Sequence, residues 1–134
     1  MKRLVFLLAL IVLIIMGCFG NSDVFDRYFK GESAHWIGLY QVVGSSSDHV
    51  STDKLIYKGS DPSLVGRVKY SFKFGSDAEG TSGEQVLLKD KGYIMGHGGG
   101  NGAVIPKNDT AEVTVEWNGQ TEKFSLNPSG PIQI

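Results

Sequence analysis

Strict alternation of apolar and polar residues is the feature that most constrains the fold of this chain. In "RVKYSFKF", residues 67–74, every second residue is apolar: Val68, Tyr70, Phe72 and Phe74. The same period of two recurs in "AEVTVEW", residues 111–117. This period is typical of strands that bury one face of an antiparallel sheet, whereas amphipathic helices place apolar residues every three or four positions. The sequence therefore predicts an all-β domain.

The dipeptide Asn118-Gly119 follows the second of these strands and predicts a tight hairpin. Both residues adopt positive φ at little energetic cost, as the two-residue type I′ turn requires. Pairing Trp117 with Gln120 across the turn fixes the register of both strands. In this register Val115 faces Glu122, so the first strand is expected to bury more apolar surface than the second.

Further strands are expected in short apolar segments that are separated by turn-forming residues. They cover residues 35–43, 53–59, 84–90, 92–96 and 103–105. Gly, Ser, Asp and Pro dominate the separators, as they do in turns. Short strands at this spacing in about a hundred residues predict an antiparallel β-sandwich of the immunoglobulin-like kind, with a small β-barrel as the alternative.

The N-terminal segment has the pattern of an export signal. Lys2 and Arg3 precede thirteen consecutive apolar residues, 4–16. This run is shorter than the roughly 20 residues that span a bilayer. The sequence "IMGC" resembles the lipobox of bacterial lipoproteins, and Cys18 is the single cysteine of the chain. Acylated Cys18 would anchor the protein stably to a membrane; a signal peptide with an unmodified cysteine is the alternative.

The chain is expected to divide into a signal, a tether and one domain. Residues 1–17 form the predicted lipoprotein signal peptide, 18–30 the lipidated cysteine with a tether, and 31–134 the single domain. Of 13 basic residues, Lys2 and Arg3 leave with the signal, so 11 basic residues face 14 acidic ones and the net charge is −3. Because no basic stripe is present to neutralise phosphates, no nucleic-acid partner is expected.

A glycine-rich segment is the most distinctive motif of the domain. It comprises Gly96, His97, Gly98, Gly99, Gly100, Asn101 and Gly102. Its letters resemble the oxyanion-hole loop of lipases, but the chain has no Gly-x-Ser-x-Gly elbow, and the lysine of a phosphate-binding loop is missing. Glycine runs are typical of segments that need positive φ or close backbone approach. The run is therefore predicted to be an irregular loop and, with residues 44–50, a candidate binding loop.

Two other groups of residues have chemical meaning. A copper or zinc site is the alternative to a partner-binding loop, with the ligands Met95, His97 and His35. Met95 and His97 would share a face if the strand continued through Gly96. Ser33 and His35 lie two residues apart, but no acidic third member of a nucleophile–base set is evident. No catalytic residue and no cofactor are therefore predicted.

Three segments carry a resemblance to a known group of proteins: "FKGESAHWIGLYQV", "YKGSDPSLVGRVKYSF" and "GHGGGNGAVIPKNDTAEVTVEWNGQTEKFSL". They are similar to small surface lipoproteins of Gram-positive bacteria that share a Gly-Glu-Ser-x-x-Trp start, a glycine-rich connection and a closing Trp-x-Gly hairpin. The similarity covers nearly all of residues 29–126. It implies surface display and a β-sandwich, and it supplies no catalytic residues.

These features together predict a lipoprotein on the extracytoplasmic face of the cell membrane. Its expected role is non-catalytic, either binding or structural, at the cell envelope. The expected partners are the membrane, through the lipid, and an envelope protein or the cell wall.

Overall fold

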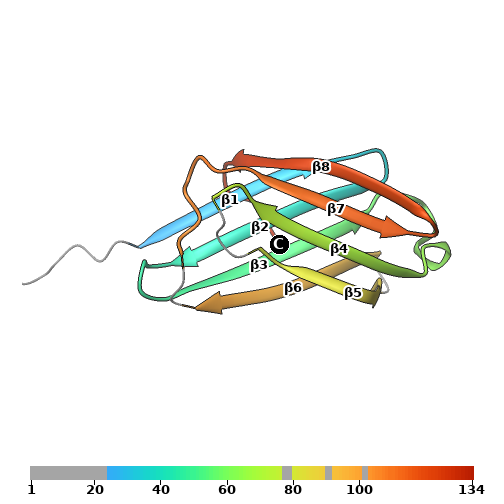
Figure 1. Ribbon diagram of the computed structural model, residues 1–134, viewed down its shortest axis with the longest axis horizontal. Coiled ribbons are helices and arrows are strands. Elements are labelled where there is room, and N and C mark those ends of the chain that lie inside the picture. The colour runs from blue at the N-terminus through green and yellow to red at the C-terminus, as the bar shows by residue number, and fades with distance from the viewer. Residues whose placement is uncertain (1–23, 77–79, 90–91, 101–102) are drawn as a thin grey trace, which may run out of the picture.

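The computed structural model of the chain describes residues 24–76, 80–89, 92–100 and 103–134. These residues form eight strands and one short 3₁₀ helix (Figure 1). The elements are β1 (Phe25–Glu32), β2 (Trp36–Gly44), β3 (His49–Tyr57), η1 (Pro62–Leu64), β4 (Arg67–Phe74), β5 (Ser82–Leu87), β6 (Tyr93–Gly100), β7 (Ala111–Trp117) and β8 (Gln120–Ser129). Neighbouring strands pair antiparallel, so the all-β antiparallel prediction is confirmed. No helix in these ranges is long and apolar enough to cross a membrane.

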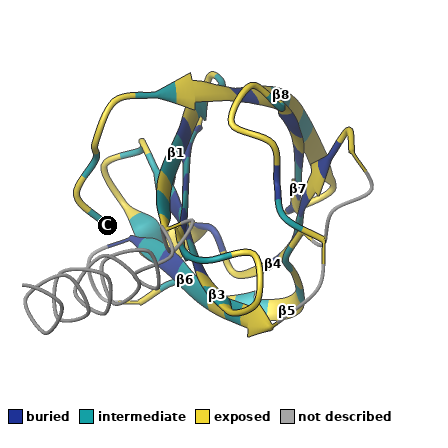
Figure 2. Ribbon diagram, turned by 90° about the vertical axis from the view of Figure 1, so that its left-hand side faces the viewer, coloured by how far each residue is buried: buried dark blue, intermediate teal, exposed yellow. Residues whose placement is uncertain are grey.

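The eight strands form one sheet in the order β5-β4-β7-β8-β1-β2-β3-β6. β8 joins the two halves of this sheet, because it pairs with β7 through residues 120–126 and with β1 through residues 127–129. Viewed end-on, the sheet curls almost into a ring (Figure 2), and its edge strands β5 and β6 lie along the same side of the molecule in Figure 1. This architecture agrees with the small β-barrel that the sequence leaves open as the alternative to a sandwich.

Apolar side chains fill most of the interior and alternate along the strands as predicted. On β4 the buried residues are Val68, Tyr70, Phe72 and Phe74, and on β7 they are Ala111, Val113, Val115 and Trp117. The ring of Phe74 lies edge-to-face against two other buried rings, with centroid distances of 5.1 Å to Phe29 and 4.9 Å to Tyr40. Such aromatic pairs stabilise a core beyond their buried area. They connect β4 to β1 and β2 across the barrel.

The β7–β8 hairpin has the predicted turn and register. Residues 118 and 119 have φ values of 46° and 72°, the positive values that a type I′ turn needs. Trp117 pairs with Gln120 and Val115 with Glu122. Both the turn and the register are therefore confirmed.

Three segments differ from the prediction. Residues 25–30, assigned to the tether, form most of β1, because the inward-facing Arg27 interrupts the apolar alternation that would have revealed a strand. β3 begins at His49 rather than at residue 53, because its first inward-facing residues are polar. Residues 103–105, expected as a strand, lie outside the strands. The signal peptide and Cys18 lie outside the described residues, so lipidation stays a prediction.

Candidate functional site

The inner face of β3 carries polar side chains, whereas the inner faces of β4 and β7 are apolar. His49, Ser51 and Asp53 alternate along this face, and we call these three residues the polar stripe. In the ladder between β3 and β6 they lie opposite Gly100, Gly98 and Gly96, respectively. The glycine run of the sequence therefore belongs to the strand that pairs with the polar stripe in the sheet.

The glycines of β6 leave room for the polar side chains that face them. A Cβ atom at Gly96 would lie 2.6 Å from Oδ1 of Asp53, and one at Gly98 would lie 2.9 Å from Oγ of Ser51. Real Cβ atoms essentially never approach another heavy atom this closely. The prediction that the run forms a loop is wrong for residues 96–100, because close backbone approach within a strand explains the glycines. Asn101 and Gly102 lie outside the described residues.

Asp53 is the most unusual member of the polar stripe. Its side chain is 0% exposed, and neither carboxylate oxygen has a hydrogen-bond partner among the described residues. Burial raises the pKa of this carboxyl above its ordinary value of 3.8, and the nearby Thr81 hydroxyl offsets part of the rise without reaching hydrogen-bond geometry. Burial and the charge of Asp53 also raise the pKa of Tyr70 on β4. The carboxylate of Asp53 therefore lies inside the barrel, against Gly96 of the neighbouring strand β6.

A small cavity adjoins the polar stripe where residues 80–81, just before β5, lie beside residues 98–100 of β6. We call this place the seam. The cavity has a volume of about 60 Å³, and its polar lining includes His49, Ser51 and Thr81. Within the described part of the chain, Nδ1 of His49 and Oγ1 of Thr81 are buried without a hydrogen-bond partner. Because at least about 90% of buried polar groups in proteins are paired, these atoms mark the seam as the strongest candidate site.

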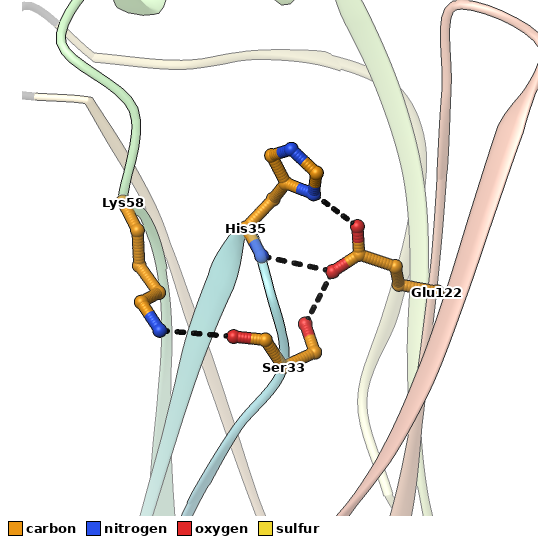
Figure 3. Close-up of polar contacts among 4 residues, drawn as sticks. All are labelled: Ser33, His35, Lys58 and Glu122. Atoms are coloured by element: carbon orange, nitrogen blue, oxygen red, sulfur yellow. Dashed lines mark hydrogen bonds and ion pairs between the residues drawn. The ribbon is translucent and has the colours of Figure 1, made fainter.

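A second polar cluster lies at the connection between β1 and β2 (Figure 3). Its centre is the carboxylate of Glu122 on β8. Ser33 Oγ donates a hydrogen bond to Glu122 Oε1 at 2.6 Å, and the backbone N–H of His35 donates to the same oxygen at 3.0 Å. Nδ1 of His35 lies 2.5 Å from Glu122 Oε2. Lys58 Nζ donates to the backbone carbonyl of Ser33 at 3.0 Å.

This cluster differs from the relay of a hydrolase. In a Ser-His-Asp relay the hydroxyl bonds to the imidazole and the imidazole to the carboxylate. Here Ser33 and His35 both bond to Glu122, so the carboxylate clamps the β1–β2 connection onto β8. Partial burial raises the pKa of Glu122, but the hydrogen bonds from Ser33 and His35 together lower it by more. The pKa of Glu122 therefore lies below its ordinary value.

The proposed metal ligands lie in two places. His97 is exposed on the outer face of β6, with Nδ1 3.4 Å from Oγ1 of Thr52, and Met95 lies on the same face. His35 precedes Trp36, which pairs with the far end of β3 at Tyr57, whereas His97 pairs with Thr52. Five residues of strand, about 17 Å, separate these positions along β3. No group of three His, Cys, Asp or Glu side chains suited to a metal ion occurs in the described ranges.

The other predicted binding loop, residues 44–50, is shorter than expected. β2 ends at Gly44 and β3 begins at His49, which leaves residues 45–48 as the connection. The backbone N–H of Ser45 donates to the carbonyl of Asp48 at 2.8 Å and closes this turn. It borders the end of the barrel at which the seam cavity lies.

The sequence did not single out Asp53 or Thr81. A signal for Asp53 is nevertheless present, because His49, Ser51 and Asp53 are in phase with the apolar residues Leu55 and Tyr57. Polar residues that continue the phase of a buried face are candidates for an interior site. Thr81 has no comparable signal, since its place at the seam depends on how the sheet closes.

Comparison with known proteins adds no family. The sequence matches no family model, and neither a curated protein nor a solved structure is similar to the chain. The resemblance to Gram-positive surface lipoproteins stays a prediction. Function is therefore argued from the geometry of the site and the chemistry of its residues.

Proposed function

We propose that this protein is a lipid-anchored, extracytoplasmic β-barrel with a non-catalytic binding role at the cell envelope. The observation that carries the binding role is the set of buried polar atoms without partners beside the seam cavity. Leaving such groups unpaired costs about 1–3 kcal/mol each. A bound species that satisfies them is the simplest reason for a small barrel to retain them.

The position of the first strand supports an anchor at one end of the barrel. Val24 follows Cys18 by six residues, which reach at most about 20 Å when fully extended. Val24, Val43 and Val50 are exposed by 68%, 38% and 57%. Val43 pairs with Val50 next to the turn of the β2–β3 hairpin, beside the start of β1. Exposed apolar side chains next to a short tether suit an end that faces a membrane.

The absence of catalysis is proposed from the arrangement of Ser33, His35 and Glu122. Their hydrogen bonds all converge on the carboxylate, so the imidazole of His35 does not accept the Ser33 proton as the base of a Ser-His-Asp relay would. We expect the purified protein to hydrolyse simple esters and phosphoesters no faster than its Ser33→Ala variant. Turnover that disappears in Ser33→Ala would contradict the non-catalytic proposal.

Lipidation is tested by expressing the full chain and its Cys18→Ala variant in a bacterial host with labelled palmitate. We expect the label and the membrane fraction to contain the wild-type protein and not the variant. Unlabelled wild-type protein in the soluble fraction would contradict the anchor. The labelling result does not depend on what the seam binds, so the two parts of the proposal fail separately.

A further inference from the structure

The buried carboxylate of Asp53 needs a counter-charge or a proton. Charged groups inside proteins are paired, coordinate a metal ion or become neutral, because an isolated buried charge is very costly. In the described ranges the ion pairs are made by His35, Lys58 and Lys69. The charge of His97 influences Asp53, but this side chain lies on the outer face of β6 and contacts Thr52 there. No cationic side chain of the described residues therefore pairs with Asp53.

Three hydroxyl-bearing residues are neighbours of Asp53. Tyr40 faces Asp53 from β2, Tyr70 influences it from β4, and Thr81 approaches it from the seam. Ser51 is the next inward residue on β3 and lines the cavity together with Thr81, whereas Asp53 lies just behind this lining and is reached from the cavity through Thr81. A proton on Asp53 would neutralise the carboxyl and occupy one of its oxygens. A cation would neutralise the charge and accept several oxygen ligands at once.

The size and composition of the cavity restrict the cation. A volume of about 60 Å³ accommodates only a few water-sized groups, since each needs roughly 10–15 Å³. Calcium takes six to eight oxygens, several of them carboxylate oxygens, whereas Asp53 is the only carboxylate of the polar stripe. His49 lies four residues along the strand from Asp53, about 13 Å, so the two cannot share a zinc or copper ion.

We propose that the seam binds a small monovalent cation, of the size of Na⁺, K⁺ or ammonium, through the carboxylate of Asp53 and the hydroxyls of Ser51 and Thr81. This inference rests on the proposed binding role and names its ligand class. The glycines of β6 permit the site, because side chains at Gly96 and Gly98 would occupy the space of Asp53 and Ser51. Waters in the remaining cavity complete the coordination of the ion and satisfy Nδ1 of His49.

The experiment is a thermal unfolding titration of the full-length protein in detergent at constant ionic strength. Choline chloride is the starting salt, because choline is too large for the cavity, and it is replaced stepwise by NaCl, KCl or NH4Cl. A ligand that binds only the folded state raises the melting temperature. We expect at least one of the three cations to raise it saturably by about 4 °C or more. Which one does so identifies the ion.

Variants connect this response to the site. Asp53→Asn keeps the shape of the side chain and removes its charge, so its melting temperature should not respond to the replacement of choline. Thr81→Val should respond with a midpoint at least tenfold higher in concentration, which keeps the test informative if Asp53→Asn fails to fold. Asp48→Asn, at an exposed position in the β2–β3 connection, is the matched control and should respond like the wild type.

Two results would overturn the inference. One is an equal melting temperature in all four salts, which would mean that the cavity holds water and Asp53 holds a proton. The other is a response of Asp53→Asn or Thr81→Val that equals that of the wild type, which would place the ion elsewhere. Neither result changes the labelling of Cys18, so this inference and the proposed anchor are tested apart.

Discussion

The two halves of the barrel interior use the same alternating geometry for different purposes. On β4 and β7 each inward position carries an apolar side chain, and these eight side chains make up nearly half of the 17 buried core residues in the described part of the chain. On β3 the inward positions from His49 to Asp53 are polar, and they pair with glycines of β6. The first half stabilises the fold through burial. The second half buries less apolar surface, because polar side chains line its interior next to a cavity.

The largest effect on stability is expected in the apolar half. Phe74→Ala removes a ring that packs against Phe29 and Tyr40 and should lower the free energy of unfolding by about 3–5 kcal/mol. Urea denaturation measures this loss. Leu87→Ala is the control, because Leu87 is 59% exposed and its loss should stay within about 0.5 kcal/mol. A loss at Phe74 no larger than the control would remove the contrast between the halves.

An intermediate effect is expected where the glycine strand meets the polar stripe. Gly96→Ala places a methyl group against the carboxylate of Asp53, and overpacking of this kind destabilises by about 1–3 kcal/mol. Adding Asp53→Ala removes the obstructing oxygens, so the double variant should lose less stability than the two single variants together. A double-mutant cycle should give a coupling energy of about 0.5–3 kcal/mol.

The control for this cycle is Gly130→Ala, because a Cβ atom at Gly130 meets nothing within 4 Å. Its free energy of unfolding should match the wild type within about 0.5 kcal/mol. Additive losses in the Gly96 and Asp53 cycle would show that the two positions do not touch, and the explanation of the glycine run would then be wrong.

The smallest effect is expected at the Glu122 cluster, which lies at the end of the barrel away from the seam cavity. Glu122→Gln weakens the hydrogen bonds from Ser33 and His35 and should lower the free energy of unfolding by about 0.5–1.5 kcal/mol at pH 7. Because the folded-state pKa of Glu122 lies below its ordinary value of 4.5, its contribution is complete above pH 4.5 and is lost as the pH falls through the folded-state pKa. The difference between wild type and variant should shrink over that range.

Denaturation with urea at a series of pH values measures this difference. Glu116→Gln is the matched control, because the carboxylate of Glu116 is exposed and lies 3.8 Å from Lys69 Nζ, where an ion pair contributes little. A wild-type advantage over Glu122→Gln that stays constant down to pH 3 would contradict the ionised carboxylate as its source.

The parts of the fold that the sequence predicts are those in which local chemistry decides the structure. The Asn118-Gly119 turn fixes the β7–β8 register, and each inward residue of β4 is apolar, so pattern and burial agree. The inward position of Glu122 also follows from the sequence, because the predicted register places this carboxylate opposite Val115 on the buried face. A carboxylate there needs a partner, although its partner His35 lies 87 residues away in the chain.

The parts that the sequence does not predict are strands whose inward residues break the apolar pattern. Arg27 occupies an inward position of β1 and interrupts the apolar alternation there. Its guanidinium donates a hydrogen bond to the backbone carbonyl of Ile105. β6 has glycine at most positions from 96 to 100, so neither face carries a periodic signal. No local sequence pattern predicts the seam, because its position depends on how the two edges of the sheet meet. The phase that Asp53 shares with Leu55 and Tyr57 indicates an inward position, but the lack of a partner for its carboxylate is visible only in three dimensions.

The most direct test of the central claim is the pH titration of the Asp53 carboxyl carbon by NMR, with the signal assigned through Asp53→Asn. With choline as the sole monovalent cation, the pKa of Asp53 should lie above its ordinary value of 3.8, because the carboxylate is buried without a partner. Adding the cation that raises the melting temperature should lower this pKa, since the ion favours the charged form. A pKa at or below 3.8 in choline, or one that no cation moves, would contradict the account.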